Sequence, residues 1–297
     1  MILDLSLKQG KRLDQALMET LEISRSKCQK MIENDYVFVN GKKVRSSYLI
    51  KENDQVEVQE YKEPIMNITP EKMDLDIVYE DDDVIIINKK NGIVVHPGSG
   101  NYEHTLVNGL LYHSSSLSNT NGEFRPGIVH RIDAYTTGLL MVAKNNEAHE
   151  ILAKQLEEKT TTRKYVALVW GVISNDTGTI DAPIGRDKND RKKMAVVEDG
   201  KKAVTHFRVL ERFKEATFIE LSLETGRTHQ IRVHMNYINH PVVNDPVYGK
   251  RKIIDETGQC LHAKTLGFIH PKTKQYMEFT SELPQEFLNI LRQFKDS

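Results

Sequence analysis

The stretch RPGIVHRIDAYTTGLLMV, residues 125–142, decides how the rest of the chain is interpreted. A polar cluster at 130–133 and 136–138 lies between two apolar runs, 128–129 and 139–143. Both runs are short, aliphatic and bounded by turn residues, so we predict that they are buried strands. A carboxylate buried between them without a partner would cost several kcal/mol. We therefore expect Asp133 to have an ion-pair partner, a chemical role, or both.

The composition indicates a soluble protein of two domains. The chain has 297 residues, of which 39% are hydrophobic and 28% are charged. No apolar run approaches the roughly 20 residues of a membrane-spanning helix. The N-terminus alternates apolar and charged residues, which is not typical of a signal peptide. Cys28 and Cys260 belong to no CxxC pattern. We therefore expect two free, buried thiols and a cytoplasmic protein.

Residues 1–62 have the pattern of a self-contained unit. Leucines recur every four residues over 13–21, which predicts a helix. Ser24 can cap a second helix. A strand at 36–39 is followed by Asn40-Gly41, a strong hairpin turn signal, and a further strand at 56–58 closes the unit. On these features alone, the unit is a small α/β domain with charged faces.

A linker and a larger domain follow. Residues 63–74 contain two prolines and no clean periodicity, so we predict a linker there and a second domain over 75–297. An aliphatic run at 84–89 predicts a buried strand. The three aspartates at 81–83 precede it, and a turn is the expected structure because adjacent side chains of an extended chain point to opposite faces. The glycines at 92–100 fit no phosphate-binding motif.

The charge is nearly balanced, which forbids a uniformly basic surface but not a local patch. The net charge is −1. The stretch 186–193 carries a local excess of positive charge. A charge run of this kind is more often a solvated loop than a binding site. The stretch ends in three basic residues, Arg191, Lys192 and Lys193.

The polar cluster at residues 130–138 resembles the signature of the RluA-type pseudouridine synthases. In that family a stretch H-R-L-D-x-x-T-S-G carries the catalytic aspartate, and here it is His130 to Gly138. Ile132 and Thr137 are conservative changes. Ala134 and Tyr135 replace residues that are commonly charged in the family, which bears on the choice of the target uridine. The resemblance extends in order through nearly the whole chain, including 163–167, 226–232 and 261–271. The basic run at 186–193 leads into 193–196, which is close to the wording of the family, so the resemblance makes Arg191, Lys192 and Lys193 candidate RNA contacts.

The N-terminal unit resembles the S4 RNA-binding domain, with 12–14, 24–26 and 39–41 as the matching pieces. Its basic residues become candidate RNA contacts: Arg12, Arg25, Lys27 and Lys30. The two lysines fall outside the apolar face of the second helix and can therefore meet solvent or phosphate. The resemblance implies an α+β protein. Its small N-terminal S4-like α/β domain would precede a larger catalytic domain built on a mixed, mostly antiparallel sheet.

The reaction that the resemblance implies needs few groups. Isomerising uridine breaks the bond from C1′ to N1, turns the base and rejoins it at C5, so no metal or other cofactor is required. Asp133 would be the catalytic carboxylate, and the resemblance implies that Arg227 is the cation opposed to it. Tyr165 matches the active-site tyrosine of the family. Arg131 matches a residue that inserts near the vacated base stack or contacts the RNA backbone. His130 should face the packed side and have no catalytic role.

We expect no metal site among the histidines. His229 and His234 are the nearest conspicuous pair. Five residues apart on a helix, they would lie about 140° apart and could not chelate one ion.

Two other functions stay open at this point. A hydrolase of N-glycosidic bonds would use Asp133 as a nucleophile and would need a second carboxylate to activate water. A non-catalytic RNA-binding or ribosome-assembly factor could keep the same fold. The resemblance favours RNA as the partner, with large-subunit ribosomal RNA ahead of transfer RNA, and we expect a monomer that binds no membrane.

Overall fold

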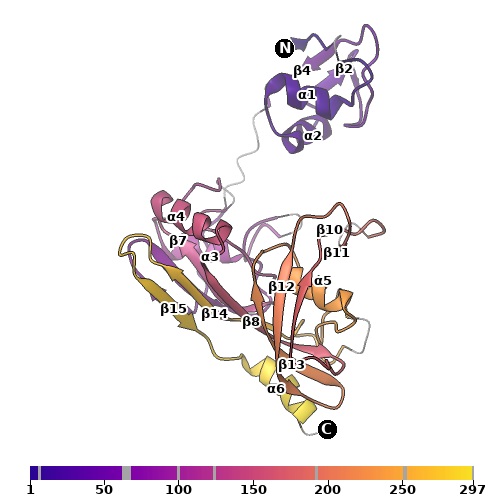
Figure 1. Cartoon of the computed structure of the whole chain (residues 1–297). Coiled ribbons are helices and arrows are strands. Elements are labelled where there is room, and N and C mark those ends of the chain that lie inside the picture. Colours follow the sequence, from indigo (N-terminus) through magenta and orange to yellow (C-terminus); the bar gives the residue numbers. More distant parts are fainter. Residues whose placement is uncertain are drawn as a thin grey trace. The chain divides into compact units, whose positions relative to one another are not determined.

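The computed structural model describes residues 1–5, 8–61, 68–98, 101–122, 125–190, 193–249 and 253–295. The chain divides into two compact units, Met1–Met66 and Asn67–Ser297 (Figure 1). Residues 62–67, which include the first part of the expected linker at 63–74, lie outside the described residues. The rest of the expected linker, from residue 68, belongs to the second unit, where the backbone N–H of Glu71 donates to the Asn108 carbonyl.

The N-terminal unit combines a small antiparallel sheet with two helices. The sheet has the order β1 (Ile2–Leu3), β4 (Val56–Val58), β2 (Val37–Val39) and β3 (Lys42–Lys43). Helix α1 spans Leu13–Leu21, and α2 spans Arg25–Glu33. As predicted, the Ser24 hydroxyl caps α2 by accepting from the Lys27 N–H. The apolar faces of both helices meet the sheet in one core.

One buried carboxylate, Asp14, ties the two helices together. Its side chain is fully buried at the start of α1. It accepts hydrogen bonds from both Arg12 and Arg25, at 3.0 to 3.1 Å, and from Gln29 at 2.7 Å. Burial alone would raise the pKa of Asp14, but these three donors hold it well below its usual range.

The second unit is built on a mixed sheet of nine strands. Its main path is β5 (Ile77–Glu80), β6 (Val84–Lys89), β7 (Thr137–Ala143), β14 (Leu261–Ile269), β8 (Thr162–Trp170), β13 (Ala216–Leu223), β12 (Val204–Arg212) and β9 (Thr177–Asp181), with β15 (Tyr276–Thr280) paired to β14. Strands β7 and β14 run parallel, and the other pairs are antiparallel. A separate hairpin joins β10 (Ile184–Arg186) to β11 (Met194–Val196).

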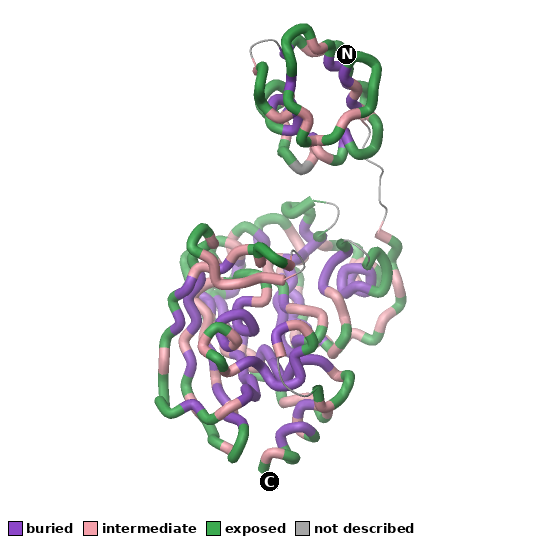
Figure 2. Tube along the Cα trace, turned by 90° about the vertical axis from the view of Figure 1, so that its right-hand side faces the viewer, coloured by how far each residue is buried: buried purple, intermediate pink, exposed green. Residues whose placement is uncertain are grey.

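Helices cover both faces of the large sheet, which explains its continuous aliphatic strands. Alternate residues of β6 enter different cores: Ile85 and Ile87 pack in one, and Val84 and Ile86 pack in the other. The first core includes residues of α3 (Leu106–His113), α5 (Gln230–Tyr237) and α6 (Gln285–Lys295). The second includes α4 (Asn146–Glu157). Figure 2 shows the buried interior of this unit enclosed by exposed loops.

The two predicted strands around the polar cluster have different outcomes. The run at 139–143 lies in β7, as expected. The prediction for 128–129 is wrong, because Ile128 forms one isolated bridge to Val142 and the chain then leaves the sheet as a loop. At the start of β7, Gly138 has φ +105°, and a side chain there would overlap the backbone of Ala263 on β14.

No helix in the described part of the chain is both long enough and apolar enough to cross a membrane.

Candidate active site

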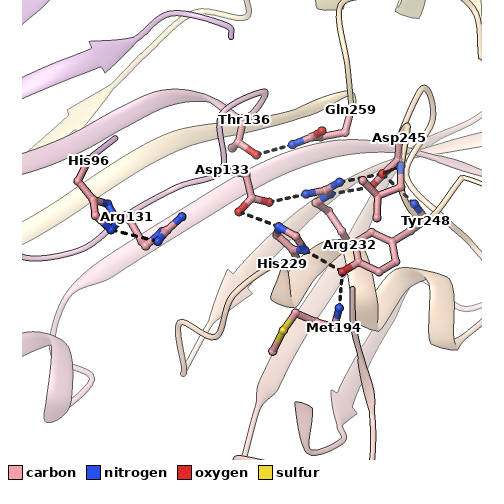
Figure 3. Close-up of polar contacts among 11 residues, drawn as sticks. His96, Arg131, Asp133, Thr136, Met194, His229, Arg232, Asp245, Tyr248 and Gln259 are labelled. Carbon is pink, nitrogen blue, oxygen red and sulfur yellow. Dashed lines mark hydrogen bonds and ion pairs between the residues drawn. The ribbon is translucent and has the colours of Figure 1, made fainter. Parts of the chain in front are cut away.

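Asp133 lies in the loop that leads into β7, and a guanidinium holds one of its two oxygens. The side chain is 17% exposed, and its Oδ2 accepts from Nη1 of Arg232 on α5 at 2.9 Å (Figure 3). The other oxygen, Oδ1, accepts no hydrogen bond from any described residue. The ring of His229 lies near this oxygen, with Nε2 at 3.9 Å. Asp133 is therefore fixed on one side and open on the other.

Arg232 is itself fixed by a second carboxylate. Its Nε and Nη2 donate to the two oxygens of Asp245 at 2.7 and 2.9 Å, which is the bidentate geometry that suits arginine. Asp245 is fully buried and also accepts from the backbone N–H groups of Val247 and Tyr248. Burial alone would lower the pKa of Arg232, but its bonds to Asp245 and the charge of Asp133 raise it above its ordinary value.

The loop that carries Asp133 is held by buried side chains from other elements. Lys89, at the end of β6, is 1% exposed, and its Nζ donates to the Ala134 carbonyl at 2.7 Å. Gln259 donates to the Thr136 hydroxyl at 3.1 Å. Burial lowers the pKa of Lys89 to about 7, although the negative charge of Asp133 acts in the opposite direction. These contacts fix the backbone on the C-terminal side of the aspartate.

A pocket of about 90 Å³ opens beside the carboxylate. Asp133, Arg232 and Tyr165 all line it. Tyr165 lies on β8 opposite Ala263 of β14 and is 7% exposed, and burial raises the pKa of its hydroxyl. All three predicted catalytic residues, Asp133, Tyr165 and Arg227, therefore line one cavity.

The predicted pairing of Asp133 with Arg227 is wrong. Arg227 is exposed, and its Nε donates to the Lys202 carbonyl at 2.9 Å. The reason is the place where α5 begins, which is Gln230, three residues after Arg227. Arg227 therefore precedes the helix and turns away, whereas Arg232 lies within the helix and faces the carboxylate. Arg227 still lines the pocket.

Three arginines surround the pocket without a carboxylate partner in the part of the chain that the structure describes. They are Arg131, Arg163 and Arg227. The expected proximity of Arg131 to Asp133 is present, although the segment is a loop rather than a strand. Arg131 lies 3.3 Å from Nε2 of His96, whose pKa burial and the nearby arginines lower to about 4, so a neutral ring can accept the hydrogen bond.

His130 faces the packed side, as predicted. Its Nε2 accepts from the Met141 N–H at 3.2 Å, and burial lowers its pKa to about 3. It therefore serves as a neutral acceptor for β7.

Comparisons with known proteins place this site in a family. A model described as RNA pseudouridylate synthase matches residues 83–237, and an S4 domain model matches residues 11–56. The chain belongs to the RNA pseudouridine synthase family. It is an isomerase of the RluD type with an N-terminal S4 domain, which confirms the predicted family, reaction class and α+β fold.

Two relatives match almost the whole chain. An uncharacterized RNA pseudouridine synthase YlyB of Bacillus subtilis is 53% identical over 289 residues, which cover 97% of this chain and 95% of the relative. The ribosomal large subunit pseudouridine synthase D of Pseudomonas aeruginosa is 43% identical over 305 residues, with 97% and 94% covered. The structure of human RNA pseudouridylate synthase domain containing 1 shares the fold, with a TM-score of 0.59 at 24% identity, covering 80% of this chain and 98% of that one.

The basic residues predicted to bind RNA fall into three groups. Arg12 and Arg25 hold the buried carboxylate of Asp14. Lys27 is half-buried and Lys30 exposed on α2. In the third group, at 191–193, Arg191 and Lys192 lie outside the described residues. Lys193 precedes β11, and its Nζ lies 3.8 Å from Oδ2 of Asp190.

The aspartates at 81–83 form the expected turn, although two of them converge with a histidine. Ligand atoms of Asp81, Asp83 and His270 lie within 4.8 Å of one another. However, Asp81 already accepts from two backbone N–H groups, from Tyr79 and from His270. This arrangement satisfies Asp81 within the protein and orders the turn before β6.

Sequence reasoning missed Arg232, Asp245 and Lys89 as members of the site. Arg232 stands in the same motif as Arg227 and could have been weighed against it. Lys89 carried a signal, since a lysine at the end of a buried aliphatic run needs acceptors for its charge. Asp245 had no local signal, because its partner is set by the tertiary fold.

Proposed function

We propose that this pseudouridine synthase isomerises a uridine in large-subunit ribosomal RNA and that Asp133 is its catalytic carboxylate. The observation that carries the proposal is the asymmetry of Asp133. One oxygen is bound to a guanidinium that Asp245 holds through two further hydrogen bonds, and the other faces a pocket with no hydrogen bond to a described residue. A carboxylate needs a free oxygen to attack a substrate or to take a proton from it.

The arginine offsets the cost of placing a carboxylate in a partly buried site. Burial disfavours the charged form of a carboxylate, and an opposed cation restores it. Lysine could be neutralised in such a place, whereas arginine keeps its charge. Because Asp245 occupies two nitrogens of Arg232, the third is aimed at Asp133 with little freedom. In this proposal Asp245 is a positioning residue and Arg232 is part of the active site.

A uridine paired in a helix cannot reach this pocket, so the base must be flipped out or already unpaired. The Tyr165 ring is placed to stack on the flipped uracil. The three arginines at the pocket, which have no carboxylate partner among the described residues, supply positive charge where the sugar–phosphate backbone would pass. A local cationic rim of this kind is compatible with a net charge of −1.

The pocket argues against a glycoside hydrolase. Asp133 is the one carboxylate among the described residues that line it. A hydrolase of N-glycosidic bonds would need a second carboxylate to activate water, and the nearby Asp245 is fully committed to Arg232 and two backbone N–H groups. A non-catalytic factor has no need for the ordered pair of Asp133 and Arg232.

Large-subunit ribosomal RNA is supported by the relatives that carry this target in their names, which match the chain from the S4 domain to the end of the catalytic unit. The same proposal places the enzyme in the cytoplasm, where bacterial ribosomes are made and where buried, unpaired cysteines such as Cys28 and Cys260 persist. We propose that it acts there as a monomer, without a cofactor.

Pseudouridine mapping of ribosomal and transfer RNA tests the proposal. The RNA is taken from cells with the gene, without it, and with the gene encoding Asp133→Asn. We expect defined pseudouridines in large-subunit RNA to disappear in the last two. Loss of pseudouridine from transfer RNA alone would identify transfer RNA as the substrate in place of ribosomal RNA. Unchanged pseudouridine in both RNAs, or pseudouridine formed by the Asp133→Asn variant, would refute the proposed function.

A further inference from the structure

We propose that His229 is a further residue of this active site and that its Nε2–H donates a hydrogen bond to a carbonyl oxygen of the flipped uracil. The inference deepens the proposed function and rests on it, because it places the base beside Asp133. Its evidence is separate: the geometry of one histidine and of the tyrosine behind it.

His229 is held so that its two ring nitrogens face different surroundings. The residue is the N-cap of α5 and has a left-handed backbone, with φ 57° and ψ 19°. Its Nδ1 lies 2.7 Å from the hydroxyl oxygen of Tyr248 (Figure 3). Its Nε2 lies 3.9 Å from Oδ1 of Asp133, which is too long for a hydrogen bond, in the pocket that both residues line.

The hydrogen bonds of Tyr248 decide which ring nitrogen carries the proton. The Tyr248 oxygen accepts from the backbone N–H of Met194 on β11 at 2.9 Å. Its own proton is then free to be donated to Nδ1 of His229. A neutral imidazole that accepts at Nδ1 carries its hydrogen on Nε2. Burial lowers the pKa of His229, although Asp133 opposes this effect, so the neutral ring is the expected form.

Tyr248 is a rigid support for this arrangement. Its backbone N–H donates to Asp245, and the guanidinium of Arg232 lies 5.0 Å from the centre of its ring. The histidine, the tyrosine and the arginine therefore form one packed group behind the carboxylate. A donor placed by such a group loses little entropy when a ligand binds.

The left-handed backbone of His229 contributes to the direction of its ring. Ten described non-glycine residues have a positive φ, so the conformation alone marks no function, but His229 is the one of them that lines this pocket. The conformation lets the His229 carbonyl accept from the Val233 N–H at the start of α5 while the ring lines the pocket.

The chemistry gives this donor a purpose. When the bond from C1′ to N1 breaks, its electron pair stays with the base, and the negative charge spreads to the carbonyl oxygens at C2 and C4. A hydrogen bond from Nε2–H stabilises this charge and retains the loose base until C5 bonds to C1′. The proton then leaves C5 and N1 ends protonated. His229 itself transfers no proton.

Two substitutions separate the ring from the backbone. His229→Asn keeps a residue type that tolerates the left-handed conformation and an amide at the place of Nδ1, but it removes the Nε2 donor. His229→Gln places its amide nitrogen near the position of Nε2. His113→Asn is the matched control, since His113 lies on α3 and bonds to Glu80. Turnover is measured as tritium release from a large-subunit ribosomal RNA transcript labelled at C5 of uridine.

We expect His229→Asn to lower kcat by about 100-fold with KM changed less than about threefold, because a preorganised donor acts on developing charge. His229→Gln should recover about tenfold of this loss, and both variants should keep the Tm of the wild type. The control should keep its kcat. The proposal is overturned if His229→Asn retains kcat within about threefold, or if its Tm falls and glutamine restores nothing.

The tautomer is read independently of activity. Long-range proton–nitrogen NMR of histidine-labelled enzyme, with His229→Asn to assign the signal, should show the hydrogen of His229 on Nε2. Tyr248→Phe should shift it toward Nδ1. A wild-type ring protonated on Nδ1 would overturn the proposal. Absence of turnover by the wild-type enzyme on ribosomal RNA, with the Nε2–H tautomer present, would instead refute the proposed substrate.

Discussion

The two units of this enzyme each contain an aspartate held by arginine, and the two carboxylates differ in what they leave free. Asp14 in the N-terminal unit is fully buried, and both of its oxygens accept hydrogen bonds from Arg12, Arg25 or Gln29. Asp133 is 17% exposed, and only Oδ2 is bound by a described side chain. Both oxygens of Asp14 are therefore held, whereas one oxygen of Asp133 has no hydrogen bond to a described residue.

The difference lies in how the arginines are arranged around the acid. Around Asp14, three side chains donate four hydrogen bonds to one carboxylate. Around Arg232, two carboxylates share one guanidinium, and the buried Asp245 takes the larger share. We expect the several donors around Asp14 to stabilise the N-terminal unit. The guanidinium that Asp133 shares with Asp245 leaves one oxygen of Asp133 without a described hydrogen bond. The following predictions test this comparison, from the largest expected effect to the smallest.

Asp133→Asn should reduce turnover by on the order of 10⁴-fold or more while RNA affinity stays within about threefold, because the amide keeps the size and loses the reactive charge. Tritium release under single-turnover conditions measures the first quantity, and filter binding measures the second. Appreciable residual turnover would show that the open carboxylate is not the reagent.

Arg232→Ala should lower kcat by roughly 10³-fold and also destabilise the catalytic unit by about 3 kcal/mol, since two acids lose their shared cation. Arg227→Ala is the matched control from the same motif. It should leave kcat nearly unchanged and raise KM severalfold, as expected for an arginine at the pocket without a carboxylate partner among the described residues. A larger loss of kcat in the control than in Arg232→Ala would restore the pairing that the sequence suggested.

Asp14→Asn should destabilise the N-terminal unit by about 3 kcal/mol without changing kcat, because charged hydrogen bonds to a buried group are lost. The wild type should also lose stability as the pH falls below the ordinary aspartate pKa of 3.8. The pKa of Asp14 is lowered in the folded state, so below that pH the unfolded chain binds the extra proton. Amide hydrogen exchange of β2 measures both the destabilisation by Asp14→Asn and the loss of stability of the wild type at low pH. An Asp14→Asn variant that loses as much stability at low pH as the wild type would contradict this prediction.

Arg25→Ala and Lys30→Ala should separate support of Asp14 from RNA contact on neighbouring turns of α2. Arg25→Ala should lower the stability of the N-terminal unit by about 1 kcal/mol and leave the salt dependence of RNA binding unchanged. Lys30→Ala should do the reverse and reduce the salt slope by roughly one. The opposite pattern would mean that Arg25 leaves Asp14 to bind phosphate.

The features that depend on local pattern could be predicted from the sequence. The aliphatic runs of β6 and β7 and the Ser24 cap follow from periodicity and turn chemistry. Tyr165 could be placed at the pocket because the family resemblance named it. These features need no knowledge of which distant segments meet.

The rest could not be predicted because it depends on tertiary geometry. Arg227 and Arg232 stand five residues apart in one motif, and only the start of α5 decides which of them faces the acid. That start is set by the left-handed conformation of His229, which no periodicity reports. Asp245 joins the site from another segment, and Ile128 fails to continue as a strand because it finds one bridge partner only in Val142.

Gly138 has a consequence for how such a motif can evolve. The glycine ends the polar signature, yet it holds no chemistry: it lets β7 and β14 approach so closely that any side chain would collide with Ala263. The one parallel seam described in the sheet runs through this point, directly after the reactive loop. A lineage that discarded catalysis could replace the aspartate freely, but it would still have to keep the glycine. A glycine at this position in a relative therefore indicates that the two strands pack in the same way, and it does not indicate whether that relative modifies RNA.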